Sequence, residues 1–471
     1  MTVRAFDRPT RAHLVGVGGS GMSGIATALL AGGHVITGSD MIESRTIRRL
    51  RAAGIPVAVG HDASHVPDDA ELLVVSAAIA NTNSELMEGR RRRLPVLKYA
   101  EALGALMGGS RGVAVAGAHG KTTTTGLLAF VLDRLGADPT FVVGGHVGPL
   151  GGSSRVGKGP FLIAEACEYD RSFLHLQPEV AVVTNIDEDH LDYYSGIAEI
   201  TEAFREFGRL LPKDGLLVTL NEHREAFGLD PGFKAKLVTV GIGALADWVA
   251  TDCEIGARSI RFTVKRHGED VDRMTIGLPG YHNVLNSLMV LAVVDHLGFD
   301  PVIAARAIRE FRGVRRRFEV KYRRAGIVIL DDFAHHPAEI RAALASIRIT
   351  WPNSRVWCVF QPHQASRTRF LLREFAAALS LADRVVVPDI FFARDSAEER
   401  RLISSRDLVM KVLNLGADAE YLPDFEDIET HLVKNLRPRD VVVTMGAGDI
   451  FRVADAVAAR LENYGSTSIP A

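Results

Sequence analysis

The sequence predicts an α/β protein made of three domains in series, each built on a mainly parallel sheet. Three observations lead to this fold class. The chain has 471 residues, enough for three domains at about 150 residues each. Apolar strand-like segments alternate with helical ones, which is the pattern of parallel α/β sheets. This alternation restarts twice along the chain.

The first cycle of alternation covers residues 1–109. A strand is expected at 12–17, followed by a glycine-rich turn, a helix at 25–30 and strands at 34–37 and 72–76. This order is typical of a Rossmann-like domain. The Ala/Leu-rich stretch 99–107 ends at the glycines of 108–112, which predict a linker.

Two further cycles predict a central domain at 110–318 and a C-terminal Rossmann-like domain at 319–471. The expected elements of the central domain are strands at 113–116, 161–164 and 180–184 and a helix at 122–135. Those of the last domain are strands at 327–330, 356–360, 384–387 and 441–445.

Composition excludes several classes of protein. The 55 Lys and Arg against 57 Asp and Glu give a net charge of −2, so no global field favours nucleic acid or anionic lipid. No apolar run reaches the roughly 20 residues that cross a bilayer. The three cysteines form no CxxC pair, which argues against a disulfide framework and fits a reducing cytoplasm. We therefore expect a cytoplasmic protein with small-molecule partners, and neither nucleic acid nor stable membrane association.

A first phosphate-binding motif lies between the first strand and the first helix. The run from Gly16 through Gly18 and Gly19 to Gly21 matches GxGxxG, where backbone N–H groups and a helix N-terminus favour an anion. Asp40 ends the next strand, where dinucleotide folds keep a ribose-binding acid. The motif predicts a diphosphate site without naming the nucleotide. A tight turn for helix–strand packing is the alternative, and an NAD-dependent oxidoreductase is the competing function.

The second motif is more specific. Strand 113–116 is followed by Gly117, Ala118, His119, Gly120, Lys121, Thr122 and Thr123 and then by a helix. In such a P-loop, backbone amides cradle phosphates, the lysine contacts the outer phosphates and the hydroxyl ligates Mg²⁺. Val115 stands where the strict pattern requires glycine, so the loop is a shortened variant. The motif predicts ATP binding.

Acidic and imidazole groups follow the next two predicted strands. Glu165 directly follows the first of them, 161–164, and His190 lies in the acidic run 187–192 after the second. The carboxyl ends of the strands are the edge where α/β sheets bind ligands. Carboxylate and imidazole groups can ligate Mg²⁺ beside ATP phosphates, whereas acids exposed on loops would serve only solubility.

Three later motifs are ambiguous when each is taken alone. The run 281–287 can contact adenine or cap a helix. Two aspartates and two histidines at 331–336 precede Pro337 at a helix start. The run 360–369 brings arginines that can clamp a carboxylate or a phosphate.

Taken together and in order, the motifs resemble those of the Mur ligases of peptidoglycan synthesis, most closely the members that add L-alanine. They cover nearly the whole chain: GVGGSGMSGIA from Gly16, GSD from Gly38, AGAHGKTTT from Ala116, TNIDEDHLD from Thr184, YHNVLNS from Tyr281, FRGVRRRFE from Phe311, DDFAHHP from Asp331, FQPH from Phe360 and MGAGDI from Met445.

The resemblance implies a ligand for each group of residues. A UDP-sugar would contact Gly18, Gly19, Ser20, Gly21, Met22, Ser23, Asp40, His61 and Ser76. ATP would contact Gly117, His119, Gly120, Lys121, Thr122, Thr123, His282, Asn283, Asn286, Arg317 and Asp332. Mg²⁺ would be held by Thr122, Glu165 and His190, and the amino acid by His335, His363 and Arg367. The catalytic residues would be Lys121, Glu165, His190, Arg317 and His335.

The implied reaction is an ATP-dependent amide ligation. The lactyl carboxylate of UDP-N-acetylmuramate takes the γ-phosphoryl group of ATP, and the amine of L-alanine attacks the resulting acyl phosphate. Substrates drawn from three domains imply closure that excludes water. A monomer or a homodimer is expected.

Three positions depart from the family pattern. Ala118 replaces a threonine, Cys167 an acid, and Gln364 an arginine that would hold the amino-acid carboxylate. Two alternatives therefore stay open. One is a related ligase with another amino acid or peptide substrate, and the other is a nucleotide-binding relative without catalytic activity.

Overall fold

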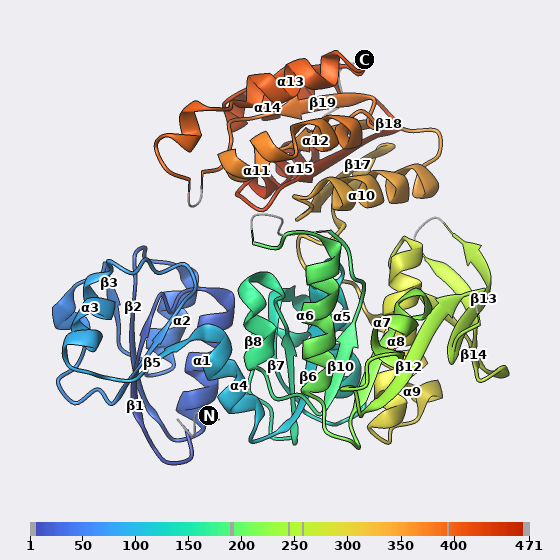
Figure 1. Ribbon diagram of the computed structural model, residues 1–471. Coiled ribbons are helices and arrows are strands. Elements are labelled where there is room, and N and C mark those ends of the chain that lie inside the picture. Colours follow the sequence, from blue (N-terminus) through green and yellow to red (C-terminus); the bar gives the residue numbers. More distant parts are fainter. Residues whose placement is uncertain (1–5, 189–192, 244, 257–258, 393–394, 465–471) are drawn as a thin grey trace. The chain divides into compact units, whose positions relative to one another are not determined.

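A computed structural model of the chain describes residues 6–188, 193–243, 245–256, 259–392 and 395–464 (Figure 1). It divides into two compact units. The first comprises Met1–Glu254, Ile260–Gly277 and Tyr281–Arg312, and the second Ile255–Ser259, Leu278–Gly280 and Gly313–Ala471. The first unit holds two sheets and the second holds one. Arg316 and Arg317, expected at the end of the central domain, belong to the second unit.

The N-terminal sheet is parallel throughout and has the strand order β3-β2-β1-β4-β5. This order reverses between β1 and β4, the switch point where α/β folds bind ligands. Its strands are β1 (Arg11–Val15), β2 (Val35–Asp40), β3 (Val57–Val59), β4 (Leu72–Val75) and β5 (Val96–Lys98). Its helices are α1 (Ser20–Ala31), α2 (Arg45–Ala52), α3 (Ser84–Arg91) and α4 (Tyr99–Met107).

The central sheet has the order β15-β14-β13-β12-β11-β10-β6-β9-β7-β8. The strands are β6 (Arg111–Ala116), β7 (Thr140–Val147), β8 (Gly152–Arg155), β9 (Phe161–Glu165), β10 (Val180–Val183), β11 (Leu216–Leu220), β12 (Lys236–Ile242), β13 (Trp248–Ile255), β14 (Ile260–Arg266) and β15 (Glu269–Ile276). The helices are α5 (Lys121–Arg134), α6 (Ile197–Arg209), α7 (Arg224–Gly228), α8 (Tyr281–His296) and α9 (Pro301–Glu310). The expected linker shrinks to residues 108–110, because α4 ends and β6 begins beside them.

The C-terminal sheet has the order β16-β17-β21-β18-β19-β20, in which only the β16–β17 pair is antiparallel among the described residues. The strands are β16 (Glu319–Arg324), β17 (Ile327–Asp332), β18 (Arg355–Phe360), β19 (Arg384–Val387), β20 (Ala419–Tyr421) and β21 (Asp440–Met445). The helices are α10 (Pro337–Thr350), α11 (Ala365–Phe370), α12 (Leu372–Leu379), α13 (Ser405–Leu413), α14 (Phe425–Asn435) and α15 (Phe451–Tyr464).

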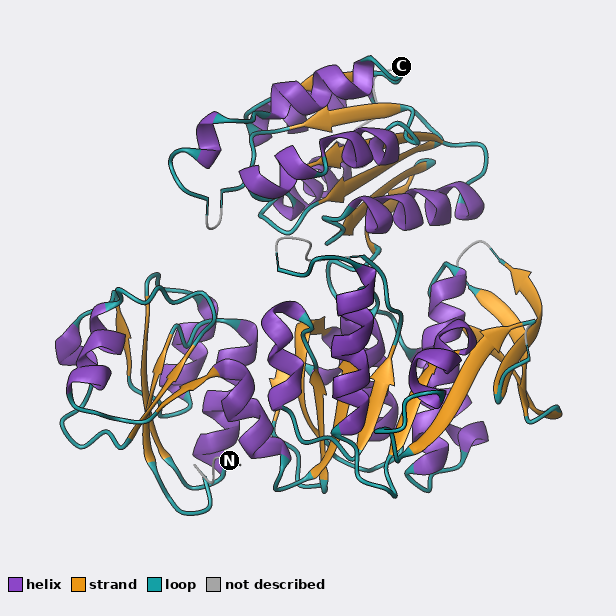
Figure 2. Ribbon diagram, viewed as in Figure 1, coloured by secondary structure: helices purple, strands orange, loops and turns teal. Residues whose placement is uncertain are grey.

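Helices cover both faces of this last sheet (Figure 2). One face carries a core with side chains from α10, α12 and α13. The other carries a core with side chains from α14 and α15. Burial on both faces explains why strands such as β21, with the sequence DVVVTM, are continuous apolar runs. Within the described ranges, no helix is both long and apolar enough to cross a membrane.

The predicted fold class is therefore confirmed. Each strand expected from the apolar runs is present, with its ends shifted by a few residues. The sequence analysis did not predict the antiparallel β14–β15 hairpin, whose polar, solvent-exposed positions give a weaker pattern than a buried parallel strand.

Candidate active site

The P-loop follows β6 and leads into α5. Gly117 has φ of +132°, and Gly120, the residue before α5, has φ of +82°. A Cβ at Gly117 would lie 2.0 Å from the Thr184 hydroxyl oxygen, so only glycine fits there. Asn185 holds the loop from the side: its Oδ1 accepts the His119 N–H at 2.9 Å, and its Nδ2 donates to the His119 carbonyl at 3.1 Å. The loop is thus pinned by the residues that follow β10.

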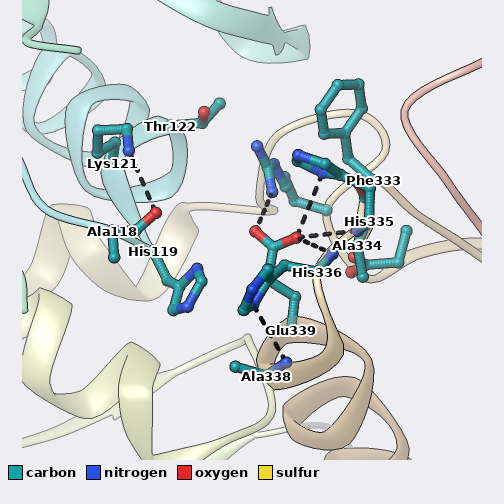
Figure 3. A network of polar contacts seen from close by, with 12 residues as sticks. Ala118, His119, Lys121, Thr122, Phe333, Ala334, His335, His336, Ala338 and Glu339 are labelled. Atoms are coloured by element: carbon teal, nitrogen blue, oxygen red, sulfur yellow. Dashed lines mark hydrogen bonds and ion pairs between the residues drawn. The ribbon is translucent and has the colours of Figure 1, made fainter. Parts of the chain in front are cut away.

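The Lys121 ammonium lies against its own loop and one acidic side chain. It donates to the Ala118 carbonyl at 3.2 Å (Figure 3) and to both carboxylate oxygens of Glu168 at 2.9 Å. Burial opposes the charged form, but the attraction of Glu168 outweighs it and raises the pKa of Lys121. The side chain of Glu168 is only 4% exposed. A permanently charged ammonium is therefore held at the mouth of a phosphate-binding loop.

Thr122 and Glu165 lie together beside this loop. The Thr122 hydroxyl donates to Glu165 Oε2 at 3.1 Å, and Glu165 Oε1 accepts the Gly144 N–H. These oxygens are hard donors of the kind Mg²⁺ prefers. His190 lies outside the described residues. Among those described, no cluster of three or more His, Cys, Asp or Glu is arranged to hold a metal ion.

The start of α8 brings three polar residues near the P-loop. Asn283 contacts the His282 ring at 3.1 Å, and Asn286 donates to Asn283 Oδ1 at 3.3 Å. A Cβ on Gly120 would lie 3.4 Å from Asn286 Oδ1. Burial lowers the pKa of His282, which favours the neutral ring. A cavity of about 460 Å³ opens next to this helix start, lined by Ile242, Gly243, Ala250, Thr251, Asp252, Cys253 and Tyr281.

The residues expected at a UDP-sugar gather at the carboxyl edge of the N-terminal sheet. The Asp40 carboxylate accepts the Gly18 N–H at 2.8 Å. Ser76 lies beside Gly16, 3.0 Å from the position of an added Cβ, and His61 follows β3 closely. Ser20, Met22 and Ser23 lie in the first turn of α1, directly after Gly19.

Gly21 is required for packing as well. A Cβ there would lie 2.6 Å from the Tyr99 ring. A bulky residue at this position would displace Tyr99, so it cannot serve as a clean probe of ligand binding.

In the second unit, Asp332 is the last residue of β17, and its carboxylate accepts hydrogen bonds from backbone N–H groups. Its carboxylate accepts the Phe318 and Ala334 N–H groups, both at 2.7 Å. Burial raises the pKa of Asp332 to about 6, although Arg317 and these N–H groups act against the shift. Its neighbour Asp331 binds Thr444 at 2.7 Å and Arg316 at 3.2 Å. Arg316 is therefore engaged in holding the sheet.

Glu339 organises the histidines at the start of α10 (Figure 3). Its carboxylate accepts the backbone N–H groups of His335 at 2.9 Å and His336 at 3.2 Å. It also lies 3.3 Å from His335 Nδ1 and 3.9 Å from the Arg317 guanidinium. Burial lowers the pKa of His335 despite the nearby Glu339, which favours the neutral ring, the form that has a free nitrogen lone pair.

The residues expected at the amino acid lie near one another in this unit. His363 has its ring centroid 6.3 Å from that of His335 and stacks on Phe391 at 5.6 Å. Arg367 lies on α11 and is close enough to lower the pKa of His335. Gln364, directly before α11, has φ of +68° and donates its N–H to the Phe391 carbonyl.

Several residues of these sites were not identified from the sequence. They are Glu168, Asn185, Thr184 and Glu339. Glu339 lies three residues after His336 at a helix start, the spacing of a capping box, so this signal was available. The pairing of Glu168 with Lys121 had no such local signal.

Three family models match consecutive parts of the chain. Residues 11–111 match the Mur ligase family catalytic domain, 115–294 the Mur ligase middle domain, and 316–448 the Mur ligase glutamate ligase domain. The UDP-N-acetylmuramate–L-alanine ligase of Caldanaerobacter subterraneus subsp. tengcongensis is 42% identical over 96% of this chain and 97% of its own. That of Geobacter sulfurreducens is 41% identical over 97% and 99%.

Solved structures agree in fold. UDP-N-acetylmuramate–alanine ligase MurC from Thermotoga maritima matches with a TM-score of 0.80 and 29% identity over 98% of this chain and all of its own. MurF from Thermotoga maritima in complex with ADP matches with a TM-score of 0.61 at 17% identity, over 91% and 95%. Mur ligase family models match most of the chain, and one relative is 42% identical to it over 96% of its length. The chain therefore belongs to the Mur ligase family.

Proposed function

We propose that this chain is an ATP-dependent ligase that joins L-alanine to the lactyl carboxylate of UDP-N-acetylmuramate. The observation that carries the proposal is the Lys121–Glu168 pair at a P-loop, in a chain 42% identical over 96% of its length to a ligase of that name. A Rossmann oxidoreductase would leave this second phosphate loop without a role.

In the proposed reaction, a carboxylate oxygen attacks the γ-phosphorus of ATP, the bond to the ADP oxygen breaks, and an acyl phosphate forms. The amine of L-alanine then attacks the acyl carbon, phosphate leaves, and the amine loses a proton. Lys121 and Arg317 offset charge on the transferring phosphoryl group. His335 is the proposed proton acceptor, supported by the lowered pKa of its ring.

We assign Mg²⁺ to Thr122, Glu165 and His190. The 3.1 Å contact between the Thr122 hydroxyl and Glu165 supports the first two as neighbouring oxygen donors. When bound, the ion would neutralise charge on the ATP phosphates. The remaining ATP ligands are Gly117, His119, Gly120, Thr123, His282, Asn283, Asn286 and Asp332.

We assign the sugar nucleotide to Gly18, Gly19, Ser20, Gly21, Met22, Ser23, Asp40, His61 and Ser76. Their position at the switch point of the N-terminal sheet supports this assignment. We also propose domain boundaries after residues 109 and 318, a cytoplasmic location and a monomeric or dimeric state. Three free cysteines, Cys167, Cys253 and Cys358, support a reducing compartment.

The amino acid is assigned to His335, His363 and Arg367. Gln364→Arg tests the departure from the family pattern, because arginine offers a carboxylate two parallel donors. The KM for L-alanine should fall, by about tenfold for one added charged hydrogen bond, while the KM for ATP stays constant. An unchanged alanine KM would mean that other residues already hold the carboxylate.

The decisive experiment measures phosphate release from ATP and Mg²⁺ with UDP-N-acetylmuramate and each proteinogenic amino acid in turn. Release that requires both the sugar nucleotide and L-alanine is expected. Release with another amino acid would keep the mechanism and change the substrate. No release with any of them would overturn the proposed function.

A further inference from the structure

A buried polar cluster lies behind the proposed sugar-nucleotide site in the N-terminal sheet. Its centre is Glu85, in the first turn of α3, whose carboxylate has no solvent exposure. Asn83 caps this helix and accepts the Glu85 N–H at 3.0 Å, so the backbone that carries the carboxylate is fixed. The cluster consists of Glu85, His13, Ser39 and His61, and His65 Nδ1 lies 3.6 Å from Glu85 Oε1.

Three groups donate to this carboxylate. His13 Nε2 lies 2.8 Å and the Ser39 hydroxyl 2.6 Å from Oε2, and His61 Nδ1 lies 2.8 Å from Oε1. Burial disfavours the charged form, but these hydrogen bonds outweigh it and hold the pKa of Glu85 below its ordinary value. An ionised carboxylate accepts only, so each partner must present a proton.

The bonds determine the tautomer of His61. Both of its hydrogen bonds to described residues use Nδ1, to Glu85 and to the Ser39 hydroxyl at 3.1 Å. With the proton on Nδ1, a neutral ring has an acceptor at Nε2. The side chain is 11% exposed, so one edge of the ring reaches solvent.

Backbone hydrogen bonds connect the segment that carries this ring to the glycine loop of the proposed site. The Gly60 N–H donates to the Asp40 carbonyl at 2.8 Å, and the Ser39 carbonyl accepts the N–H groups of Gly16 and Val17 at 2.9 and 3.0 Å. His61 and the glycine loop are therefore linked through the end of β2.

We propose that Glu85 is a positioning residue that holds His61 as a hydrogen-bond acceptor for an N–H or O–H donor of the sugar nucleotide. This inference rests on the proposed function, because it takes UDP-N-acetylmuramate as the ligand. A buried carboxylate behind a histidine is a general means of setting which ring nitrogen carries the proton.

The variant that tests it is Glu85→Gln. The glutamine amide has an oxygen that accepts hydrogen bonds and an NH₂ group that only donates them. It therefore cannot accept hydrogen bonds from His13, Ser39 and His61 together. If its NH₂ group faces His61, the proton must move to Nε2 and the acceptor is lost. The dissociation constant of UDP-N-acetylmuramate should rise about tenfold or more, with kcat at saturation and the KM for ATP within about twofold of the wild type.

Asp440→Asn is the matched control. Asp440 is also a buried carboxylate with three donors, from Arg355 and the Arg437 N–H, but lies in the other unit. Its variant should bind the sugar nucleotide as tightly as the wild type. Equal weakening in both variants would overturn the inference, because general destabilisation would then explain the result.

A direct measurement does not depend on the variant folding. Long-range ¹H–¹⁵N spectra of histidine-labelled wild type, assigned by comparison with His61→Gln, report which nitrogen is protonated. A proton on Nδ1 is expected, and a proton on Nε2 overturns the inference. Unchanged binding of UDP-N-acetylmuramate by Glu85→Gln, in spectra that show the His61 proton moved to Nε2, also overturns it. Wild type that fails to bind this ligand overturns the proposed function itself.

Discussion

At the scale of single residues, the contact between Lys121 and Glu168 affects both the stability of the fold and the proposed reaction. The pair is largely buried, and each partner offsets the cost of burying the other's charge. Lys121→Ala should lower ATP turnover by about 10²–10³-fold and the free energy of unfolding by about 3 kcal/mol, because the buried Glu168 carboxylate loses the ammonium that offsets its charge.

The double variant Lys121→Ala/Glu168→Gln separates these two effects. It also removes the charge of the buried carboxylate, so thermal stability should recover while turnover stays low. Binding of UDP-N-acetylmuramate, measured by calorimetry, should be unchanged in both variants. Turnover that survives in the single variant would contradict the role of the P-loop lysine.

Asp332 should give ATP binding a pH dependence. Its pKa is raised to about 6, so the carboxylate is ionised above that pH and takes up a proton as the pH falls through it. A carboxylate proposed to contact ATP then loses its charge and part of its capacity to accept hydrogen bonds. The KM for ATP should rise several-fold between about pH 7.5 and pH 5.5.

Asp332→Asn serves as the control, since its amide does not titrate in this range. Its KM for ATP should be higher than that of the wild type but nearly constant with pH. The same rise in this variant would assign the pH dependence to another group.

At the scale of elements, the first turn of α10 joins a helix cap to two proposed functional side chains. Glu339 accepts two backbone N–H groups and faces His335 and Arg317. Glu339→Ala removes the capping acceptor and should lower stability by about 1 kcal/mol. Glu339→Gln keeps an acceptor and should melt close to the wild type.

Both Glu339 variants should raise the KM for L-alanine, because both remove the charge that orients His335. The measurements are thermal melts and steady-state kinetics of the two proteins side by side. A normal alanine KM in Glu339→Gln would limit this carboxylate to capping the helix.

At the scale of the whole molecule, each compact unit has its own hydrophobic cores. We expect calorimetry to resolve more than one unfolding transition. UDP-N-acetylmuramate at 100 times its dissociation constant should stabilise the first unit by about 2.7 kcal/mol through mass action, and Lys121→Ala should move the same transition. One transition that contains the whole enthalpy would contradict this expectation.

The sequence by itself determined the features that depend on neighbouring residues. The strands were predictable because a strand buried on both faces must be a continuous apolar run, as β6 and β21 are. The P-loop was recognisable because its glycines, lysine and threonine act through one short stretch of backbone. The start of α10 was predictable from Pro337 for the same reason.

Only the tertiary structure decided which charged groups meet. Glu168 lies 47 residues from Lys121, and Glu85 lies 72 from His13 and 24 from His61. No local pattern encodes such pairs, because they form between elements that are far apart in the chain and meet only when the sheet and its helices pack together. Burial then sets the protonation states of these groups, since the free energy of a charge depends on all that surrounds it in space.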